Sequence, residues 1–202
     1  MKQYPSIGQV FDTSLEYTVF DKLDGSNIRA EWNPKKRFYK FGSRKLLLNE
    51  SDPKFGKAIS LIREQEDSIS KVLMELTKLG AVCYFEFFGP KSFAGYHEND
   101  DDHKSILIDV DLERQGQMEP ESFLKAFAKS VELPGVLHHG RCTEDFVESV
   151  RSGTMPGMTF EGVVGKSRKP GKWLPPHMFK LKNQAWIDKV RQMHGENAEA
   201  LL

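Results

Sequence analysis

The sequence lacks the features of several specialised protein classes. It has only two cysteines, Cys83 and Cys142, which make neither a disulfide framework nor a metal site. No apolar run approaches the roughly 20 residues of a membrane-spanning helix, and the first residues lack the apolar core of a signal peptide. We therefore expect a cytoplasmic protein with free thiols and no membrane partner.

A surplus of either charge is also missing. The formal net charge is zero, which argues against a protein that coats nucleic acid in bulk. Two stretches nevertheless contain no acid, residues 32–49 and 162–187. Their bases are Lys35, Lys36, Arg37, Lys40, Arg44 and Lys45 in the first, and Lys166, Arg168, Lys169, Lys172, Lys180 and Lys182 in the second. Such separation can create a positive surface that holds polyphosphate, although solvated faces of no special role explain the clusters equally well.

The first elements predicted are strands, followed by a helical region. Residues 15–48 alternate loosely on both sides of the turn sequence DGSN, which predicts a hairpin and a further strand at 38–41. From Ser51 to Gly80 the apolar residues recur at helical spacing, which predicts one long helix or two short ones. Ser51 or Asp52 is expected to cap the helical start.

The remaining elements alternate between apolar strands and short amphipathic helices. Strands are expected at 81–90, 104–112, 159–167 and 177–186, and helices at 119–131, 143–153 and 184–202. Neighbouring strands are joined through turns rather than by regular helical crossovers. The sequence therefore predicts an α+β fold with mainly antiparallel sheets, in a single domain spanning residues 1–202. The acidic run 97–103 is expected to be a loop rather than a metal site.

Isolated charges stand within three of the apolar strands. Glu86 lies in YFEFFG, Glu161 in FEGVV, and the pair Lys180 and Lys182 in FKLKN. A charge among buried residues costs several kcal/mol unless it is paired, so such positions often face a ligand cleft. Each segment alone is weak evidence, because half-buried strands routinely alternate polar and apolar residues.

The segment KLDGSN, residues 22–27, turns these three weak signals into a specific pattern. A K-x-D-G-x-N match precedes, in order, a strand with one glutamate, an EGVV strand and a KLK strand. This arrangement resembles the covalent nucleotidyltransferase superfamily of ATP-dependent DNA ligases, RNA ligases and messenger-RNA capping enzymes. The match spans residues 4–186 and is most similar to RNA ligases of the phage and editing type. It implies an ATP-grasp-like ligase adenylation domain with flanking helices.

The resemblance also implies roles for individual residues. Lys22 is the expected nucleophile that becomes adenylated, with Lys180 and Lys182 at the α-phosphate and Glu161 at a divalent metal, Mg²⁺ or Mn²⁺. The ATP-binding residues implied are Asp21, Asp24, Gly25, Asn27, Arg44, Glu86, Ile108 and Lys166. Among them Glu86 would hold the ribose, Asp21 would help to recognise adenine and Ile108 would pack on the base.

Two of these roles have a physical reason in the sequence. A free lysine is almost wholly protonated at neutral pH, so Lys22 needs a lowered pKa, which nearby Lys180, Lys182 and a metal ion would provide. Gly25 would let the backbone turn tightly beside the phosphate.

The function that the resemblance implies is ATP-dependent ligation of a polynucleotide, most simply RNA, in which a lysyl-AMP intermediate seals 5′-phosphate and 3′-hydroxyl ends. The basic stretches 35–45 and 166–172 would contact the phosphate backbone of RNA or of an RNA/DNA hybrid. Because only 16 residues follow Trp186, we expect a stand-alone adenylyltransferase domain without a C-terminal OB domain, and a partner protein as one source of the missing domain. The alternatives are a minimal DNA ligase that seals nicks and a non-catalytic module that binds nucleotide or nucleic acid.

Overall fold

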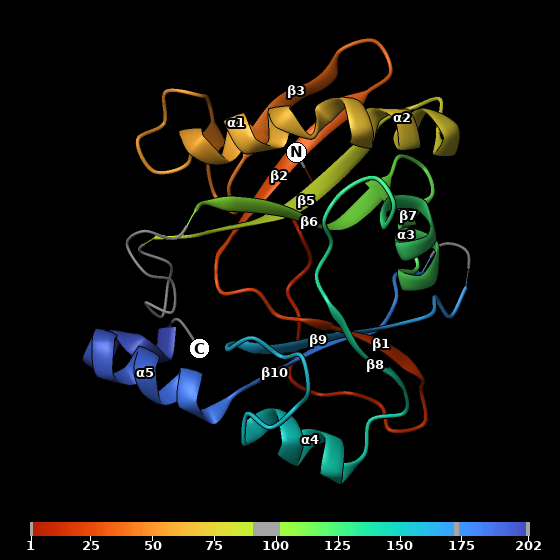
Figure 1. Ribbon diagram of the computed structural model, residues 1–202. Coiled ribbons are helices and arrows are strands. Elements are labelled where there is room, and N and C mark those ends of the chain that lie inside the picture. The colour runs from red at the N-terminus through yellow and green to blue at the C-terminus, as the bar shows by residue number, and fades with distance from the viewer. Residues whose placement is uncertain (1, 91–101, 172–173, 201–202) are drawn as a thin grey trace.

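The computed structural model describes residues 2–90, 102–171 and 174–200. Its strands form two antiparallel sheets, drawn one above the other in Figure 1, with helices on their outer sides. The acidic run predicted as a loop lies, up to residue 101, outside the described residues. No helix in the described ranges is long and apolar enough to cross a membrane.

The larger sheet has six strands in the order β4-β3-β2-β5-β6-β7. Their bounds are β2 Ser26–Asn33, β3 Arg37–Gly42, β4 Leu47–Leu48, β5 Ala81–Phe88, β6 Lys104–Leu112 and β7 Gly116–Gln117. The alternate residues of β2 and β5 that point to one face, among them Ile28, Trp32 and Phe85, are fully buried in the main core. The opposite face carries Asn27 and Glu86, which lie directly across from each other in the β2–β5 register.

Helices α1 Gly56–Glu64 and α2 Glu66–Leu76 cover the apolar face of this sheet, and α3 Pro120–Phe127 packs against the same core (Figure 1). The predicted helical region is thus two helices, which meet at Gln65. The Gln65 amide donates to the Ser105 carbonyl at 2.8 Å, which ties this junction to β6. Asp52 caps a turn before the helix, because its Oδ1 accepts from the backbone of Lys54 and Phe55, and α1 itself begins only at Gly56.

The smaller sheet has four strands in the order β10-β9-β1-β8. These are β1 Tyr17–Asp21, β8 Val136–Gly140, β9 Gly162–Ser167 and β10 Met178–Lys182. Helix α4 Glu144–Arg151 packs beneath it through Phe146 and Val150, and the Thr143 hydroxyl caps α4 as predicted. Helix α5 Gln184–His194 and the 3₁₀ helix η1 Gly195–Ala200 form a third, small cluster at the end of β10.

The predicted hairpin around DGSN is wrong. Strand β1 pairs with β8 and β9 in the small sheet, whereas β2 pairs with β3 and β5 in the large sheet. The turn residues are therefore not the tip of a hairpin but the connection by which the chain passes from one sheet to the other. Lys22 lies at the start of this connection, between the two sheets.

Candidate active site

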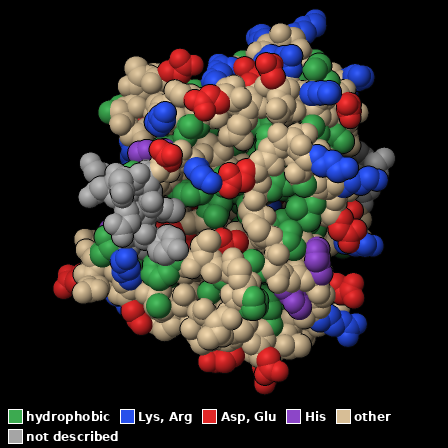
Figure 2. All heavy atoms as spheres, in the orientation of Figure 1, with side chains coloured by type: hydrophobic (Ala, Val, Ile, Leu, Met, Phe, Trp, Pro, Cys, Tyr) green, Lys and Arg blue, Asp and Glu red, His purple; other side chains and the backbone are tan. Residues whose placement is uncertain are grey.

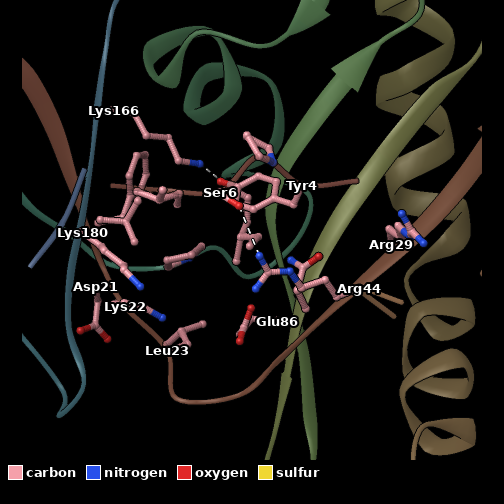
Figure 3. Close-up of a pocket in the computed structure, with 17 residues that line it drawn as sticks. Tyr4, Ser6, Asp21, Lys22, Leu23, Arg29, Arg44, Glu86, Lys166 and Lys180 are labelled. Carbon is pink, nitrogen blue, oxygen red and sulfur yellow. Dashed lines mark hydrogen bonds between the residues drawn. The ribbon is translucent and has the colours of Figure 1, made fainter. Parts of the chain in front are cut away.

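A cavity of about 280 Å³ lies between the two sheets. Both sheets line it, and so does the N-terminal segment Tyr4–Ile7 (Figure 3). The predicted site residues that line it are Asp21, Lys22, Asn27, Arg44, Glu86, Ile108, Lys166 and Lys180. Glu161, Lys182, Asp24 and Gly25 are not among its lining residues, and their positions are described below.

Lys22 is held by a carboxylate. Its Nζ lies 2.9 Å from Glu161 Oε1, and 22% of the Lys22 side chain remains exposed, against 6% of the Glu161 side chain. Burial lowers the pKa of Lys22, but the negative charges of Glu161, Glu86 and Asp24 outweigh it and leave that pKa above its ordinary value. The expectation of a lowered pKa is therefore wrong for the chain by itself, because three carboxylates outweigh the effect of burial.

Glu161 is shared between two lysines. Lys182 Nζ lies 3.6 Å from the same Oε1 atom that Lys22 contacts. Burial raises the pKa of Glu161 against the opposing effect of both lysines. Burial, with Lys180 and Lys22 nearby, lowers the pKa of Lys182 to about 8. Lys22, Glu161 and Lys182 thus form a lysine cluster of interacting charges, whose protons are easily redistributed when a charged ligand binds.

Lys180 lies two residues before Lys182 on β10, on the same face of the strand, and points into the cavity (Figure 3). Burial lowers the pKa of Lys180, and the positive charges of Lys22 and Arg44 lower it further. Arg44 faces it across the cavity from the segment after β3, where its guanidinium donates to Ser6 Oγ at 3.2 Å. Lys22, Lys180 and Arg44 thus place three positive charges around one cavity, an arrangement that suits a polyphosphate.

Glu86 enters the cavity from the middle of β5. Burial raises the pKa of Glu86 to about 8, partly offset by Lys22 and reinforced by Glu161. This carboxyl therefore takes up a proton more readily than a free glutamate, and in the protonated form it can both donate and accept hydrogen bonds. Asn27, opposite it on β2, donates to the Phe85 carbonyl at 3.5 Å and also hydrogen-bonds the Glu86 side chain.

Asp21, Asp24 and Gly25 support the inter-sheet connection. The Asp21 carboxylate accepts from the backbone and the hydroxyl of Thr159, at 3.0 and 2.9 Å, so it is aimed away from the lysines. Asp24 is buried and lies close enough to Lys22 to act on its pKa. A Cβ on Gly25 would meet the Phe87 carbonyl oxygen at 2.5 Å. Gly25 is thus required by the close approach of β5, and not only by a ligand.

Lys166 is buried in an ion pair between the sheets. Its Nζ lies 2.7 Å from Asp109 Oδ2 and donates to the Ile108 carbonyl at 2.9 Å. The same carboxylate accepts from the Tyr4 hydroxyl at 3.0 Å and from the Gln117 side chain. Lys166 therefore links β9 to β6 beside the cavity, which both Lys166 and Ile108 line.

The sequence pattern did not single out the N-terminal segment. Tyr4 and Ser6 line the cavity, Lys2 forms an ion pair with Asp111, and the Gly8 carbonyl accepts from the Lys180 backbone at 2.8 Å. The segment thus crosses from the large sheet to the small one beside the site. Nothing local in YPSIG, residues 4–8, indicates contacts with strands 100 or more residues away.

The described residues contain no cluster of three or more His, Cys, Asp or Glu side chains that could hold a metal ion unaided. Mg²⁺, however, is usually bound through one or two carboxylates together with substrate phosphates. Glu161 is a buried carboxylate at the centre of the lysine cluster, so it fits a metal that arrives with a nucleotide. It does not fit a permanently resident metal, because lysines contact it.

Comparison with solved structures identifies the fold. The chain is similar to a mutant of the Naegleria gruberi RNA ligase with ATP and Mn (TM-score 0.63, 18% identity, 88% of this chain and 52% of that chain). It is also similar to an apo mutant of that ligase (TM-score 0.64, 17% identity, 94% and 60%) and to a mutant with AMP and Mn (TM-score 0.64, 16% identity, 88% and 52%). No family model and no curated protein matched the sequence.

The predicted fold class is therefore confirmed: the chain is α+β with antiparallel sheets, and its fold is similar to that of these RNA ligase structures. At these identities the similarity concerns the fold. The chain spans about half to 60% of the length of the matched structures.

Proposed function

We propose that this chain is an ATP-dependent RNA ligase that acts through a lysyl-AMP intermediate. The observation that carries the proposal is the position of Lys22. It is a partly exposed amine at a cavity between two sheets, with Lys180 and Arg44 facing the same cavity. The likeness in fold to ligase structures that contain ATP, AMP and Mn supports the same interpretation.

In the first step Lys22 Nζ attacks the α-phosphorus of ATP, a P–N bond forms, and the bond to pyrophosphate breaks. The attacking amine must first lose its proton to solvent, which becomes easier once a bound ligand offsets the negative charge of Glu161, whose Oε1 lies 2.9 Å away. Lys180, Lys182 and Arg44 would neutralise the phosphate charges. Catalysis of phosphoryl-type transfer depends mainly on such positioning and charge neutralisation.

A divalent cation bound at Glu161 together with the nucleotide would neutralise phosphate charge and polarise the α-phosphoryl group. The carboxylate would then be drawn away from the lysine ammonium groups. The opposing charge that keeps the pKa of Lys22 high would be reduced, and Lys180 and Lys182 would favour the neutral amine.

In the later steps AMP is transferred from Lys22 to a 5′-phosphate end, and a 3′-hydroxyl then attacks that phosphate and releases AMP. The side chains of Lys35, Lys36, Arg44 and Lys45 are exposed and available to a phosphate backbone. Figure 2 shows basic side chains gathered at the upper edge of one face, over the turn between β2 and β3. In the second basic stretch Arg168 pairs with Glu121 and Lys166 with Asp109, so the first stretch is the better candidate.

The direct test is covalent labelling with α-labelled ATP and Mg²⁺ or Mn²⁺. We expect the wild-type chain to become labelled and Lys22→Arg to remain unlabelled. Lys22→Arg is the matched control, because it keeps a cation beside Glu161 but offers no lysine nucleophile. Wild-type labelling no higher than that of Lys22→Arg would overturn the proposal and leave the non-catalytic binding module as the better reading.

Substrate preference separates RNA ligation from the minimal DNA ligase. The labelled protein, freed of ATP, is offered nicked RNA duplex, nicked DNA duplex, an RNA/DNA hybrid and single-stranded RNA, each with a 5′-phosphate. We expect label to pass to the RNA end, and sealing to follow where a 3′-hydroxyl is present. Transfer to nicked DNA alone would favour the DNA ligase.

A further inference from the structure

Trp186 lies beneath the lysine cluster in the first turn of α5. It is buried, with 1% of its surface exposed, although it belongs to a helix at the edge of the molecule. The start of α5 is fixed by Asn183, whose side chain accepts from the Ala185 backbone at 3.0 Å. Because the helix begins immediately after β10, the indole is directed back toward the last residues of that strand.

The indole ring contacts Lys182. Lys182 Nζ lies 4.0 Å from the ring centroid, well within the roughly 6 Å over which a cation is attracted to an aromatic face. On its other side the same Nζ lies 3.6 Å from Glu161 Oε1, which contacts Lys22 at 2.9 Å. A continuous series of contacts therefore runs from Trp186 through Lys182 and Glu161 to Lys22.

The same helix also supports Glu161 from behind. Trp186, Val190 and Ala198 form a small buried cluster, against which Phe160 packs. Phe160 precedes Glu161, and the Glu161 carbonyl accepts from the Asn183 backbone at 3.0 Å. Helix α5 thus holds both partners of the contact between Lys182 and Glu161.

We propose that Trp186 is a positioning residue for lysyl-AMP formation, which holds the Lys182 ammonium group against Glu161 and beside the bound phosphate. The inference rests on the proposed function. A lysine side chain has four rotatable bonds and loses considerable freedom when its amine is held in one place. The indole face reduces that freedom before the nucleotide binds, whereas an aliphatic side chain of similar bulk would fill the space without attracting the cation.

The test is a double-mutant cycle on the rate of lysyl-AMP formation. We expect Trp186→Leu to lower the rate at saturating ATP by about 3- to 30-fold, the range that corresponds to a cation–π contact. Trp186→Phe, which keeps a weaker aromatic face, should lose less. In a Lys182→Ala background neither change at Trp186 should lower the residual rate further, because the residue through which Trp186 acts is absent.

Equal losses in both backgrounds would overturn the inference, because a generally structural role is independent of Lys182. Urea unfolding of each variant accompanies the kinetics, and if Trp186→Leu does not fold, Trp186→Phe carries the cycle alone. If the wild-type chain is not labelled by ATP, the proposed function itself is wrong. Wild-type labelling without coupling between Trp186 and Lys182 removes only the present inference.

Discussion

Lys22 and Glu161 form an ion pair of 2.9 Å between residues that flank the strand pair β1 and β9. The chain therefore holds its proposed nucleophile as an ammonium group, against a carboxylate that keeps the pKa of this lysine high. Reactivity then depends on whether a ligand changes the charge around Glu161. This arrangement would keep the lysine unreactive until nucleotide and metal are present.

Glu161→Gln is expected to make Lys22 more reactive in the absence of nucleotide. The amide removes the largest of the charges that raise the pKa of Lys22, so burial lowers that pKa against less opposition than in the wild type. Each unit of pKa changes the neutral fraction about tenfold, and we expect Lys22 to react at least about threefold faster with trinitrobenzenesulfonate at pH 8. Peptide mapping measures the rate at which Lys22 is modified. Lys104, which pairs with the exposed Glu132, is the internal reference. An unchanged Lys22 rate would contradict the role assigned to Glu161.

Glu86→Gln is expected to stabilise the fold increasingly as pH rises. The pKa of Glu86 is raised from 4.5 to about 8 in the folded chain, so between these values the folded state binds more protons than the unfolded state. The stability contributed by the protonated carboxyl is therefore complete below about pH 4.5 and is lost as pH rises toward 8. Urea unfolding at pH 5 and pH 8 should show the difference between variant and wild type growing by at least about 2 kcal/mol. A difference independent of pH would contradict the raised pKa.

Lys166→Met is expected to destabilise the chain strongly, because it leaves the Asp109 carboxylate buried without its cation. Breaking a buried ion pair in this way costs about 3–5 kcal/mol. Arg168→Ala is the matched control, since its pair with Glu121 is exposed and screened by solvent and should contribute little to stability. Both free energies come from urea unfolding. A loss for Lys166→Met as small as that for the control would show that this pair does not link the sheets.

Gly25→Ala is expected to weaken the packing between the inter-sheet connection and β5. The added methyl group would lie 2.5 Å from the Phe87 carbonyl oxygen, which belongs to a paired strand and cannot move cheaply. Overpacking of this kind typically costs about 1–3 kcal/mol. Gly171→Ala, where the nearest atom is 4.0 Å away, serves as the control in the same unfolding experiment. Equal stability of the two variants would contradict the predicted steric role.

The sequence predicted the elements well where periodicity was local. The strand around Glu86 and the Thr143 cap lie where expected. The strand of Lys180 and Lys182 is also present, but it ends at Lys182 rather than at the predicted residue 186, because α5 begins at Gln184. The motif residues also converge, since eight of the twelve predicted site residues line one cavity. Glu161 and Asp24 act on the pKa of Lys22, and Lys182 contacts the same Glu161.

What the sequence could not supply was long-range pairing. DGSN has the composition of a hairpin turn, but whether β1 pairs with β2 depends on strands β8, β9 and β5, which are distant in sequence. The predicted direction of the Lys22 pKa shift was wrong for the same reason. It depends on the distance to Glu161, 139 positions away along the chain, and that distance is a property of the fold rather than of the motif.

The passage of the chain from one sheet to the other at Lys22 has a mechanical consequence. A nucleotide attached to this lysine would be anchored at the seam, with the strands of both sheets within its reach. The bound nucleotide would contact both sheets at once, and would therefore oppose any change in the distance between them. The adenylated chain is accordingly expected to be a stiffer body than the free chain, and the departure of AMP to restore its freedom to move.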